Sequence, residues 1–366
     1  MKVFILVGTR PNFIKITQFK KVASQKFPKI AVSIIHTGQH YDEKMADVFF
    51  RQFNLMPDYF LNILPDTADH QIEEIIFKLE KLIETTGSPD LFMVPGDVNS
   101  TRAGAEFAKK NKLKLAHIEA GLRSFDESMP EEHNRIITDK LSDLFFVTEP
   151  SGEKHLLAEG FEKSKIHFVG NTMIDTMIAY DKEIEQSTIL NQLKISEIPF
   201  VLMTMHRPAT VDHEEEFKKL IELIKFVTIK YKIIFPIHPR TIKNAKQFNL
   251  EKEFEENKNL ICTEPLDYFS FQKLIKYCRF ILTDSGGIQE ESTYRKKPCL
   301  TLRPNTERPV TVEAGTNTLL PFNLEQLKEQ ILLIENGNYK KGQIPDMWDG
   351  GATERILKIV FNSNNG

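Results

Sequence analysis

The sequence contains little cysteine and no long hydrophobic run. Only 3 of its 366 residues are cysteines, and Cys262, Cys278 and Cys299 lie far apart with no CxxC pair. This spacing excludes a disulfide framework and a thiolate zinc site, and it favours a reducing, cytoplasmic location. No apolar run approaches the ~18 residues that a membrane span needs, so we expect no membrane insertion.

A surplus of charge of either sign is also lacking. The chain has 48 Lys+Arg against 51 Asp+Glu, a formal net charge of -3. Proteins that bind nucleic acid through bulk charge usually carry a basic surplus, so no nucleic-acid partner is expected. Hydrophobic residues make up 41% of the chain and charged residues 27%, which is typical of a soluble globular protein with a sizeable core.

Several motifs of cofactor and covalent chemistry are missing. The sequence has no GxGxxG fingerprint, no P-loop, no GxSxG elbow, no HExxH and no Cys/His cluster. These absences argue against a nicotinamide dinucleotide, a covalent hydrolase and a metal centre. We therefore expect no cofactor.

What the chain does contain is a rhythm of short apolar runs, each followed by an amphipathic stretch such as residues 72–83 or 217–226. Runs this short and apolar on both faces predict buried parallel strands, and their alternation with helices predicts doubly wound α/β domains. The predicted strands are residues 3–7, 32–36, 91–95, 113–118, 144–148 and 166–169, followed by 200–204, 233–237, 260–263, 280–283 and 299–302.

The alternation of apolar runs is interrupted between Gly170 and about Pro199, which suggests a domain junction. This stretch includes a polar helix at about residues 181–186. We predict an N-terminal Rossmann-like domain over 1–172, with a C-terminal helix at about 353–366 packing back on it, and a second Rossmann-like domain over 173–352. Two such domains would face each other across a cleft lined by the carboxyl ends of their strands, where ligands of such sheets bind.

Cationic side chains follow the first predicted strand. Gly8-Thr9-Arg10-Pro11 leads into a helix that carries Lys15. Arg10 at a strand-to-helix turn is well placed to bind a phosphate, and Lys15 follows about one helical turn later. The alternative is a surface turn with two solvated cations.

A glycine turn follows residues 280–283. The run Asp284-Ser285-Gly286-Gly287 opens a helix, so backbone N–H groups at Ser285, Gly286 and Gly287 can approach an anion closely. Glu290 or Glu291 in the next turn would suit the hydroxyls of a ribose. Alternatively, these carboxylates merely favour a helix N-terminus.

Three acidic positions follow neighbouring predicted elements. Asp97 comes after residues 91–95, Glu119 ends residues 113–118, and Glu131 with Glu132 opens a later helix. Crowded carboxylates have separated pKa values, so the three form a candidate acid/base cluster. A lone carboxylate at a strand end is more often structural, and Glu132 and His133 can equally be a solvated first turn.

One histidine stands out among ten. His206 ends the strand at 200–204 and is a candidate general acid or diphosphate ligand. His117 and His238 have similar settings at strand ends.

Taken in order, these motifs resemble the non-hydrolysing UDP-N-acetylglucosamine 2-epimerases of bacterial surface-polysaccharide pathways. The resemblance runs essentially end to end and includes Gly8-Thr9-Arg10-Pro11, Gly96-Asp97, His117-Ile118-Glu119-Ala120-Gly121, Pro130-Glu131-Glu132, His206-Arg207, the run from Asp284 to Glu291 and Thr306-Glu307-Arg308-Pro309.

The resemblance implies a glycosyltransferase-B arrangement of two domains, a homodimer and a UDP-sugar substrate. It also implies a reversible inversion at C2. A base removes the C2 proton as UDP leaves C1, which gives 2-acetamidoglucal, and re-addition of UDP completes the epimerisation. No cofactor is required.

Site residues follow from the resemblance by position. Asp97, Glu119, Glu131 and His206 are the catalytic candidates, without an assignment of which takes the C2 proton. The expected substrate-binding residues cover the diphosphate, the sugar phosphate, the ribose and the uracil: Arg10, Lys15, Leu266, Phe271, Ser285, Gly286, Gly287, Glu291 and Arg308. Core packing is the alternative for Phe271, one of 27 phenylalanines.

The sequence departs from the best-known members in two segments. Pro208-Ala209-Thr210-Val211-Asp212 follows His206-Arg207, and Tyr41-Asp42-Glu43 follows Gln39-His40. In those members both segments help to hold a second, activating UDP-N-acetylglucosamine, so we hypothesise that the allosteric site is altered or absent. The form Thr37-Gly38-Gln39-His40-Tyr41-Asp42 also occurs in relatives that act on modified UDP-sugars, such as diacetamido uronates.

Rival functions remain on the same scaffold. A glycosyltransferase would use the glycine turn but would not need the carboxylates Asp97, Glu119 and Glu131. A hydrolysing epimerase would release free N-acetylmannosamine and UDP. A non-catalytic protein would bind UDP-sugars without turnover.

Overall fold

The computed structural model describes residues 1–38, 50–64 and 66–363. The chain forms two compact units: unit 1 comprises Met1–Ala179 and Asp346–Gly366, and unit 2 comprises Tyr180–Pro345. No helix within these described ranges is long and apolar enough to cross a membrane.

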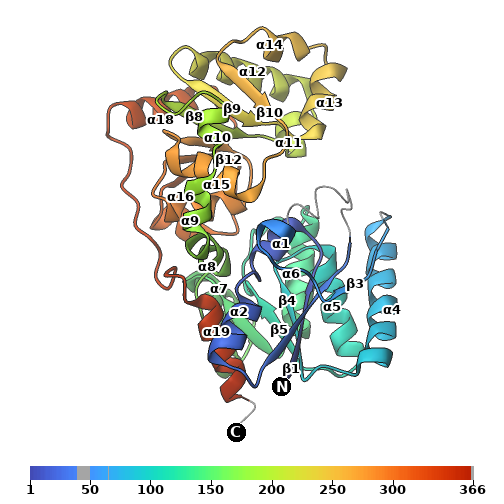
Figure 1. Ribbon diagram of the computed structural model, residues 1–366. Helices are drawn as coiled ribbons and strands as arrows, with labels where there is room; N and C mark the ends of the chain where they lie inside the picture. The colour runs from blue at the N-terminus through green and yellow to red at the C-terminus, as the bar shows by residue number, and fades with distance from the viewer. Residues whose placement is uncertain (39–49, 65, 364–366) are drawn as a thin grey trace. The chain divides into compact units, whose positions relative to one another are not determined.

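Unit 1 is built on a seven-stranded parallel sheet with the order β3-β2-β1-β4-β5-β6-β7 (Figure 1). Its strands are β1 (Lys2–Val7), β2 (Ala31–His36), β3 (Tyr59–Phe60), β4 (Leu91–Pro95), β5 (Leu115–Ile118), β6 (Leu144–Val147) and β7 (Ile166–Phe168). Its helices are α1 (Arg10–Ile14), α2 (Phe19–Lys26), α4 (Ala68–Thr86), α5 (Asn99–Lys110), α6 (Pro130–Leu141), α7 (Pro150–Ala158), α8 (Thr172–Ala179) and α19 (Ala352–Asn362), with a 3-10 turn at Lys163–Lys165.

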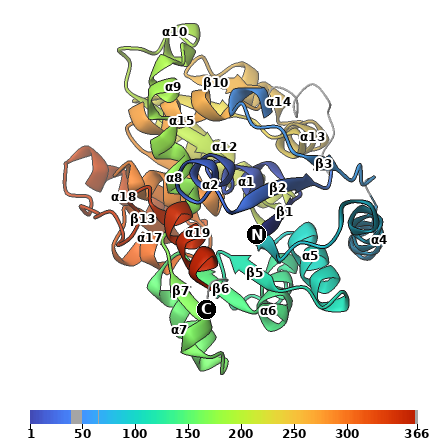
Figure 2. The ribbon, with the colours of Figure 1, turned by 60° about the horizontal axis from the view of Figure 1, so that its bottom comes forward.

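The C-terminal helix α19 completes unit 1. It packs against α2 and α8, and Figures 1 and 2 both show it beside α2. The buried Asp175 carboxylate accepts the backbone N–H groups of Ala352 at 3.1 Å and Thr353 at 2.6 Å. The indole N–H of Trp348 donates to the carbonyl of Thr148 at 3.0 Å. The two bonds to Asp175 satisfy the first N–H groups of α19, which otherwise lack partners inside the helix.

Unit 2 has a six-stranded parallel sheet with the order β10-β9-β8-β11-β12-β13. Its strands are β8 (Phe200–Thr204), β9 (Lys232–Pro236), β10 (Leu260–Thr263), β11 (Ile281–Thr283), β12 (Cys299–Leu302) and β13 (Asn317–Leu320). Its helices are α9 (Asp181–Gln186), α10 (Ile189–Gln192), α11 (Pro208–Val211), α12 (Glu214–Thr228), α13 (Pro239–Gln247), α14 (Glu251–Glu255), α15 (Tyr268–Tyr277), α16 (Gly287–Tyr294), α17 (Pro309–Glu313) and α18 (Leu324–Glu335).

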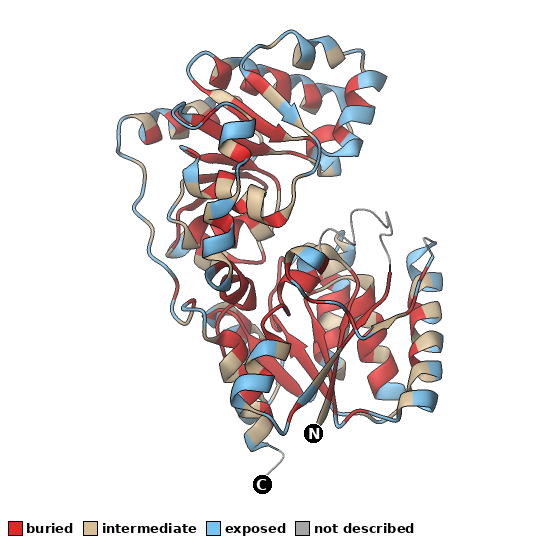
Figure 3. Cartoon of the chain, viewed as in Figure 1, coloured by how far each residue is buried: buried red, intermediate tan, exposed pale blue. Residues whose placement is uncertain are grey.

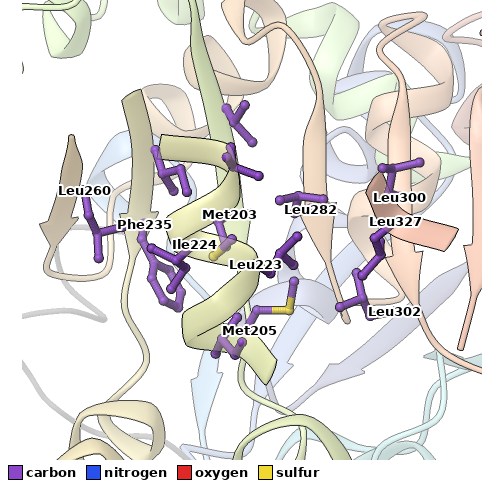
Figure 4. Packing of buried hydrophobic residues seen from close by; sticks show 14 of the residues in the cluster. Met203, Met205, Leu223, Ile224, Phe235, Leu260, Leu282, Leu300, Leu302 and Leu327 are labelled. Atoms are coloured by element: carbon purple, nitrogen blue, oxygen red, sulfur yellow. The ribbon is translucent and has the colours of Figure 1, made fainter. Parts of the chain in front are cut away.

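Both sheets are covered by helices, so their strands are buried while the outer helix faces are exposed (Figure 3). In unit 2, α12 presents Leu223 and Ile224 to Met203 and Phe235 on the sheet (Figure 4). Apolar residues on both faces of a strand are what parallel sheets require, because helices pack on either side.

The predicted α/β class with two doubly wound, parallel sheets is confirmed. All eleven predicted strands are present, and their ends differ from prediction by at most two residues. Two edge strands were not predicted. β3 has only two residues, and β13 begins with the polar pair Asn317 and Thr318, so neither gives an apolar run.

Candidate functional site

The candidate residues of unit 1 gather where the strand order reverses, between β1 and β4. Ligands of doubly wound sheets bind at the carboxyl ends of the strands at this switch point. Arg10 is the first residue of α1, directly after the Gly8-Thr9 turn that leaves β1. Asp97 follows β4, and Glu119 follows β5. The fold therefore places both kinds of candidate, cations and carboxylates, at one edge of the sheet.

Lys15 and Glu119 form a buried ion pair, with each side chain only 6% exposed. Glu119 has a positive φ of 74°. That conformation is rare for a residue with a side chain and marks a strained position, of the kind that clusters at functional sites. The backbone N–H of Glu119 donates to the carbonyl of Phe146 at 2.9 Å, which fixes the turn.

Gly96 allows Lys15 to reach this edge. Gly96 has a φ of +71°, and a Cβ there would lie 2.9 Å from Lys15 Nζ and 3.1 Å from Asn12 Oδ1. Any larger residue would be strained and would displace the ammonium group. The glycine thus brings the β4–α5 turn, which carries Asp97, against Lys15.

Asp97 is oriented by the helix α6. Arg135 Nε donates to its carboxylate at 3.0 Å, and Asn134 Nδ2 donates to its carbonyl at 3.0 Å. Arg135 also pairs with the buried Glu132. Glu132 in turn accepts the N–H groups of Ser124 at 2.9 Å and Phe125 at 3.0 Å. Glu132 is therefore structural and is not a solvated first turn.

Glu131, one residue earlier, is different. Its side chain is half-buried and forms no hydrogen bond or ion pair with any residue that the structure describes. It lies in the first turn of α6, after Pro130, on the helix that carries Asn134 and Arg135. Glu131 is consequently available for a ligand, whereas Glu132 is not.

The buried His117 connects the strand ends. Its Nε2 lies 2.8 Å from the carbonyl oxygen of Gly96, and its Nδ1 lies 2.6 Å from Asp139 Oδ1. Asp139 also pairs with Arg123 at 2.8 Å. Burial alone would raise the pKa of Asp139, but the charge and hydrogen bond of His117, together with Arg123, hold it below its ordinary value.

The candidate residues of unit 2 gather at its own switch point, between β8 and β11. His206 follows β8, and its Nδ1 lies 2.9 Å from Oδ1 of the buried Asp284. Asp284 Oδ2 accepts the backbone N–H groups of His206 and Arg207, both at 2.8 Å. Burial alone would raise the pKa of Asp284, but His206 and these N–H groups hold it below its ordinary value. The His206 side chain remains 39% exposed.

The glycine turn lies directly after Asp284. Ser285 N donates to Thr283 Oγ1 at 2.9 Å, and Gly286 is the N-cap of α16. A Cβ on Gly286 would lie 2.7 Å from Glu307 Oε1 and 3.0 Å from Arg308 Nη1. The absence of a side chain at Gly286 therefore lets Arg308 pack against the turn.

Arg308 is held by carboxylates on two sides. Its Nε lies 2.8 Å from Glu290 Oε2, and its Nη1 pairs with Glu307. Glu307 also accepts from Arg303 Nη2 at 3.0 Å. This arrangement leaves a guanidinium beside the N-terminus of α16, where an anion is favoured.

Glu291 is a buried carboxyl with a strongly shifted pKa. Burial and the negative charge of Glu290 raise the pKa of Glu291 to about 8. Tyr268 of α15 is also buried, and its pKa is raised by burial and by the charge of Glu291. A neutral carboxyl can both donate and accept hydrogen bonds, as a sugar hydroxyl requires.

Leu266 and Phe271 flank the start of α15. Both are half-buried and pack on one hydrophobic cluster of unit 2, together with Ile275 and Ile288. Core packing covers part of the Phe271 ring, and the remaining part is exposed and can contact a ligand.

Each unit therefore brings its own candidates together: Lys15, Asp97 and Glu119 in unit 1, and His206 with the glycine turn in unit 2. Sequence reasoning missed the buried charges that support them. Glu132, Arg135 and Asp139 are spaced three and four residues apart, which places them on one face of a helix. That spacing is a signal from which their cooperation could have been predicted.

Comparisons with known proteins agree with this arrangement. The family model described as UDP-N-acetylglucosamine 2-epimerase matches residues 22–361. The UDP-N-acetylglucosamine 2-epimerase of Methanocaldococcus jannaschii is 41% identical over 98% of this chain and 99% of its own length. The UDP-2,3-diacetamido-2,3-dideoxy-D-glucuronate 2-epimerase of Pseudomonas aeruginosa is 35% identical over 87% of this chain and 88% of its own length.

Solved structures match as closely. The crystal structure of the Methanocaldococcus jannaschii enzyme in complex with UDP-GlcNAc and UDP has a TM-score of 0.87 at 41% identity, covering 99% of this chain and 100% of that one. The Neisseria meningitidis UDP-GlcNAc 2-epimerase bound to UDP-GlcNAc also has a TM-score of 0.87, at 29% identity over 99% of this chain and 100% of that one. With a family model and relatives that extend over nearly its whole length, the chain belongs to the UDP-N-acetylglucosamine 2-epimerase family.

Proposed function

We propose that this protein interconverts UDP-N-acetylglucosamine and UDP-N-acetylmannosamine without net hydrolysis. A base takes the proton from C2, the C1–O bond breaks, and its electron pair leaves with UDP. This elimination gives the intermediate 2-acetamidoglucal, which has a C1–C2 double bond. UDP then adds back to C1 while a proton is delivered to the other face of C2. Family membership and the named relatives support this assignment.

The observation that carries the proposal is the set of carboxylates at the edge of the unit 1 sheet. Inversion at C2 needs groups that take and give protons on opposite faces of the carbon. We assign this task to Asp97, Glu119 and Glu131, without dividing it among them. Glu131 has no partner among the described residues, and Asp97 is oriented by Arg135. A glycosyl-transfer reaction would not require such a set.

Departing UDP needs positive charge and N–H donors at its diphosphate. We assign this role to Arg10, Lys15, His206, Arg308 and the turn formed by Ser285, Gly286 and Gly287. Asp284 holds His206 in position. Charge that develops on the leaving oxygen is then stabilised by groups that are already oriented.

The nucleoside would be recognised by unit 2. We assign Glu291 to the ribose hydroxyls and Leu266 and Phe271 to the uracil. A planar base favours an apolar or aromatic wall, and a buried carboxyl that is neutral near pH 7 can donate to one hydroxyl and accept from another.

We further propose that the protein works as a homodimer in the cytoplasm. The dimer rests on the family resemblance. The location fits the three free cysteines, two of which are buried. Sedimentation analysis of the purified protein tests the dimer, and a single monomer boundary at micromolar concentration would contradict it.

Proton NMR with UDP-N-acetylglucosamine in deuterated water tests the reaction. We expect UDP-N-acetylmannosamine to form and deuterium to appear at C2 of both the substrate and the product sugar, because elimination exchanges that proton with solvent. Accumulation of free UDP with N-acetylmannosamine would indicate a hydrolysing enzyme instead. If neither sugar changes, the next substrate is a UDP-diacetamido uronate, the sugar named for the Pseudomonas aeruginosa relative.

A further inference from the structure

Unit 2 has a hollow of about 490 Å³ at the amino ends of its strands. Pro199, Arg279 and Pro298 line it, and they lie just before β8, β11 and β12. His206 and Ser285 follow the opposite ends of β8 and β11. Five residues of strand rise ~16 Å, so the hollow is separated from the candidate site by the length of the sheet.

The hollow is lined by five cations and by no carboxylate: Arg279, Lys296, Lys297, Lys340 and Lys341. None of the five forms an ion pair with a residue in the described part of the chain. Neighbouring cations in the sequence do, since Lys276 pairs with Glu185 and Arg295 pairs with Asp181. The chain as a whole has a net charge of -3, so this cluster does not reflect a generally basic protein.

Helix ends account for only part of this charge. α15, α16 and α18 end beside the hollow, at Tyr277, Tyr294 and Glu335. The C-terminus of a helix carries about half a negative charge, so three of them offset about 1.5 of the five positive charges. The remaining positive charge is not compensated by the helix ends.

The segment that carries two of the lysines is fixed in place. The Tyr339 hydroxyl lies 2.6 Å from Thr318 Oγ1 and 2.9 Å from the carbonyl of Thr316. Lys340 Nζ donates to the carbonyl of Val312 at 2.7 Å and to that of Asn317. The hollow is thus formed before any ligand arrives, which reduces the entropy lost on binding.

We propose that this hollow binds a small, multiply charged anion, such as an inorganic polyphosphate or a phosphate ester. Its volume lies within the range of small-molecule sites, ~300–1,000 Å³. Lysine ammonium groups act as point charges that bind phosphate oxygens through charge-assisted hydrogen bonds. The site is independent of the proposed epimerase reaction.

Calorimetric titration of the full-length protein with inorganic tripolyphosphate tests the proposal. We expect saturable binding at 150 mM salt that weakens as salt increases. The double variant Arg279→Ala/Lys297→Ala should bind at least about tenfold more weakly. Lys246→Ala and Lys258→Ala remove exposed lysines elsewhere on unit 2 and should leave affinity within about twofold.

A second titration separates this hollow from the candidate site. In an Arg308→Ala background, which removes a cation from the glycine turn, tripolyphosphate binding should persist and should still depend on Arg279 and Lys297. Binding that disappears with Arg308→Ala, that is unchanged in the double variant, or that never saturates would overturn the proposal. Thermal unfolding of each variant confirms that the protein is folded.

Discussion

The imidazole of His117 lies between two acceptors, Asp139 and the carbonyl of Gly96. The distances are 2.6 Å from Nδ1 to Asp139 Oδ1 and 2.8 Å from Nε2 to the Gly96 oxygen. His117 thus links two strand ends to α6, and it holds the turn that carries Asp97.

Replacing His117 should destabilise the protein strongly. His117→Asn leaves a buried carboxylate with one partner fewer, and breaking a buried pair costs about 3 kcal/mol or more. Urea unfolding at pH 7 measures the loss. Because the pKa of Asp139 is lowered in the folded state, the stabilisation is present above about pH 4 and is lost toward more acidic pH. The exposed His133→Asn is the control and should change stability by less than ~0.5 kcal/mol.

Glu131 and Glu132 should separate activity from stability. Glu131→Gln should lower kcat by about 10²–10⁴ and leave unfolding nearly unchanged, because the side chain has no partner among the described residues. Glu132→Gln should instead destabilise the protein, since the charged Arg135 loses its buried partner. Steady-state kinetics and urea unfolding of both variants provide the comparison. Equal losses of kcat, or a large loss of stability in Glu131→Gln, would contradict the assignment.

Glu291 should make the protein less stable as the pH rises. Its pKa is 4.5 in the unfolded chain and about 8 in the folded one. Between these values the folded state keeps a proton that the unfolded state has released. The free energy of unfolding therefore falls with pH, by up to about 1.4 kcal/mol per pH unit.

Glu291→Gln should flatten this dependence. Urea unfolding at pH 5 and pH 8 measures it, and the exposed Glu329→Gln should keep the wild-type slope. A variant at Glu291 with an unchanged slope would show that this carboxyl is ionised at neutral pH.

Gly286→Ala should weaken UDP binding without unfolding the protein. The added methyl would lie 2.7 Å from Glu307 Oε1 and 3.0 Å from Arg308 Nη1, so the side chains beneath the glycine turn must move. The backbone itself is not strained, because φ is -73°. We expect UDP affinity, measured by calorimetry, to fall about tenfold. Wild-type affinity in this variant would place the diphosphate elsewhere.

Trace UDP-N-acetylglucosamine should not activate turnover of UDP-N-acetylmannosamine. Pro208 and Asp212 belong to one of the two altered segments, where α11 runs over Pro208–Val211. The other segment, from Gln39 to Glu43, lies outside the described residues. Initial rates with and without the trace compound test the hypothesis, and strong activation would show that an allosteric site survives.

The strand pattern was predictable because burial on two faces leaves a simple mark in the sequence. Residues 200–204 match β8 without a shift. β13 was not predictable in the same way. It lies at the sheet edge, and Asn317 hydrogen-bonds to Thr301 and Gln289 at 2.6 and 2.9 Å. Its burial therefore depends on polar partners that are distant in the sequence.

The candidate site was predictable in its residue types but not in its internal connections. Adjacent carboxylates such as Glu131 and Glu132 look alike in the sequence, yet helix geometry turns successive side chains by about 100°. Only the fold distinguishes the buried Glu132 from Glu131, which has no partner among residues 1–38, 50–64 and 66–363. In the same way, the position of Arg308 between Glu290 and Glu307 depends on a β12–α17 loop whose path the sequence does not reveal.

The packing of α19 on α2 has a consequence for synthesis of the chain. Unit 1 is the first to leave the ribosome, but its last helix is translated after all of unit 2. Until α19 is synthesised, the surface of unit 1 that binds it stays exposed, including the Asp175 carboxylate. Unit 2 is continuous in sequence and can fold as soon as it emerges. A chain that ends at Pro345 reproduces the state in which unit 1 lacks α19. We expect it to retain the unfolding transition of unit 2 and to lose that of unit 1, which differential scanning calorimetry would resolve.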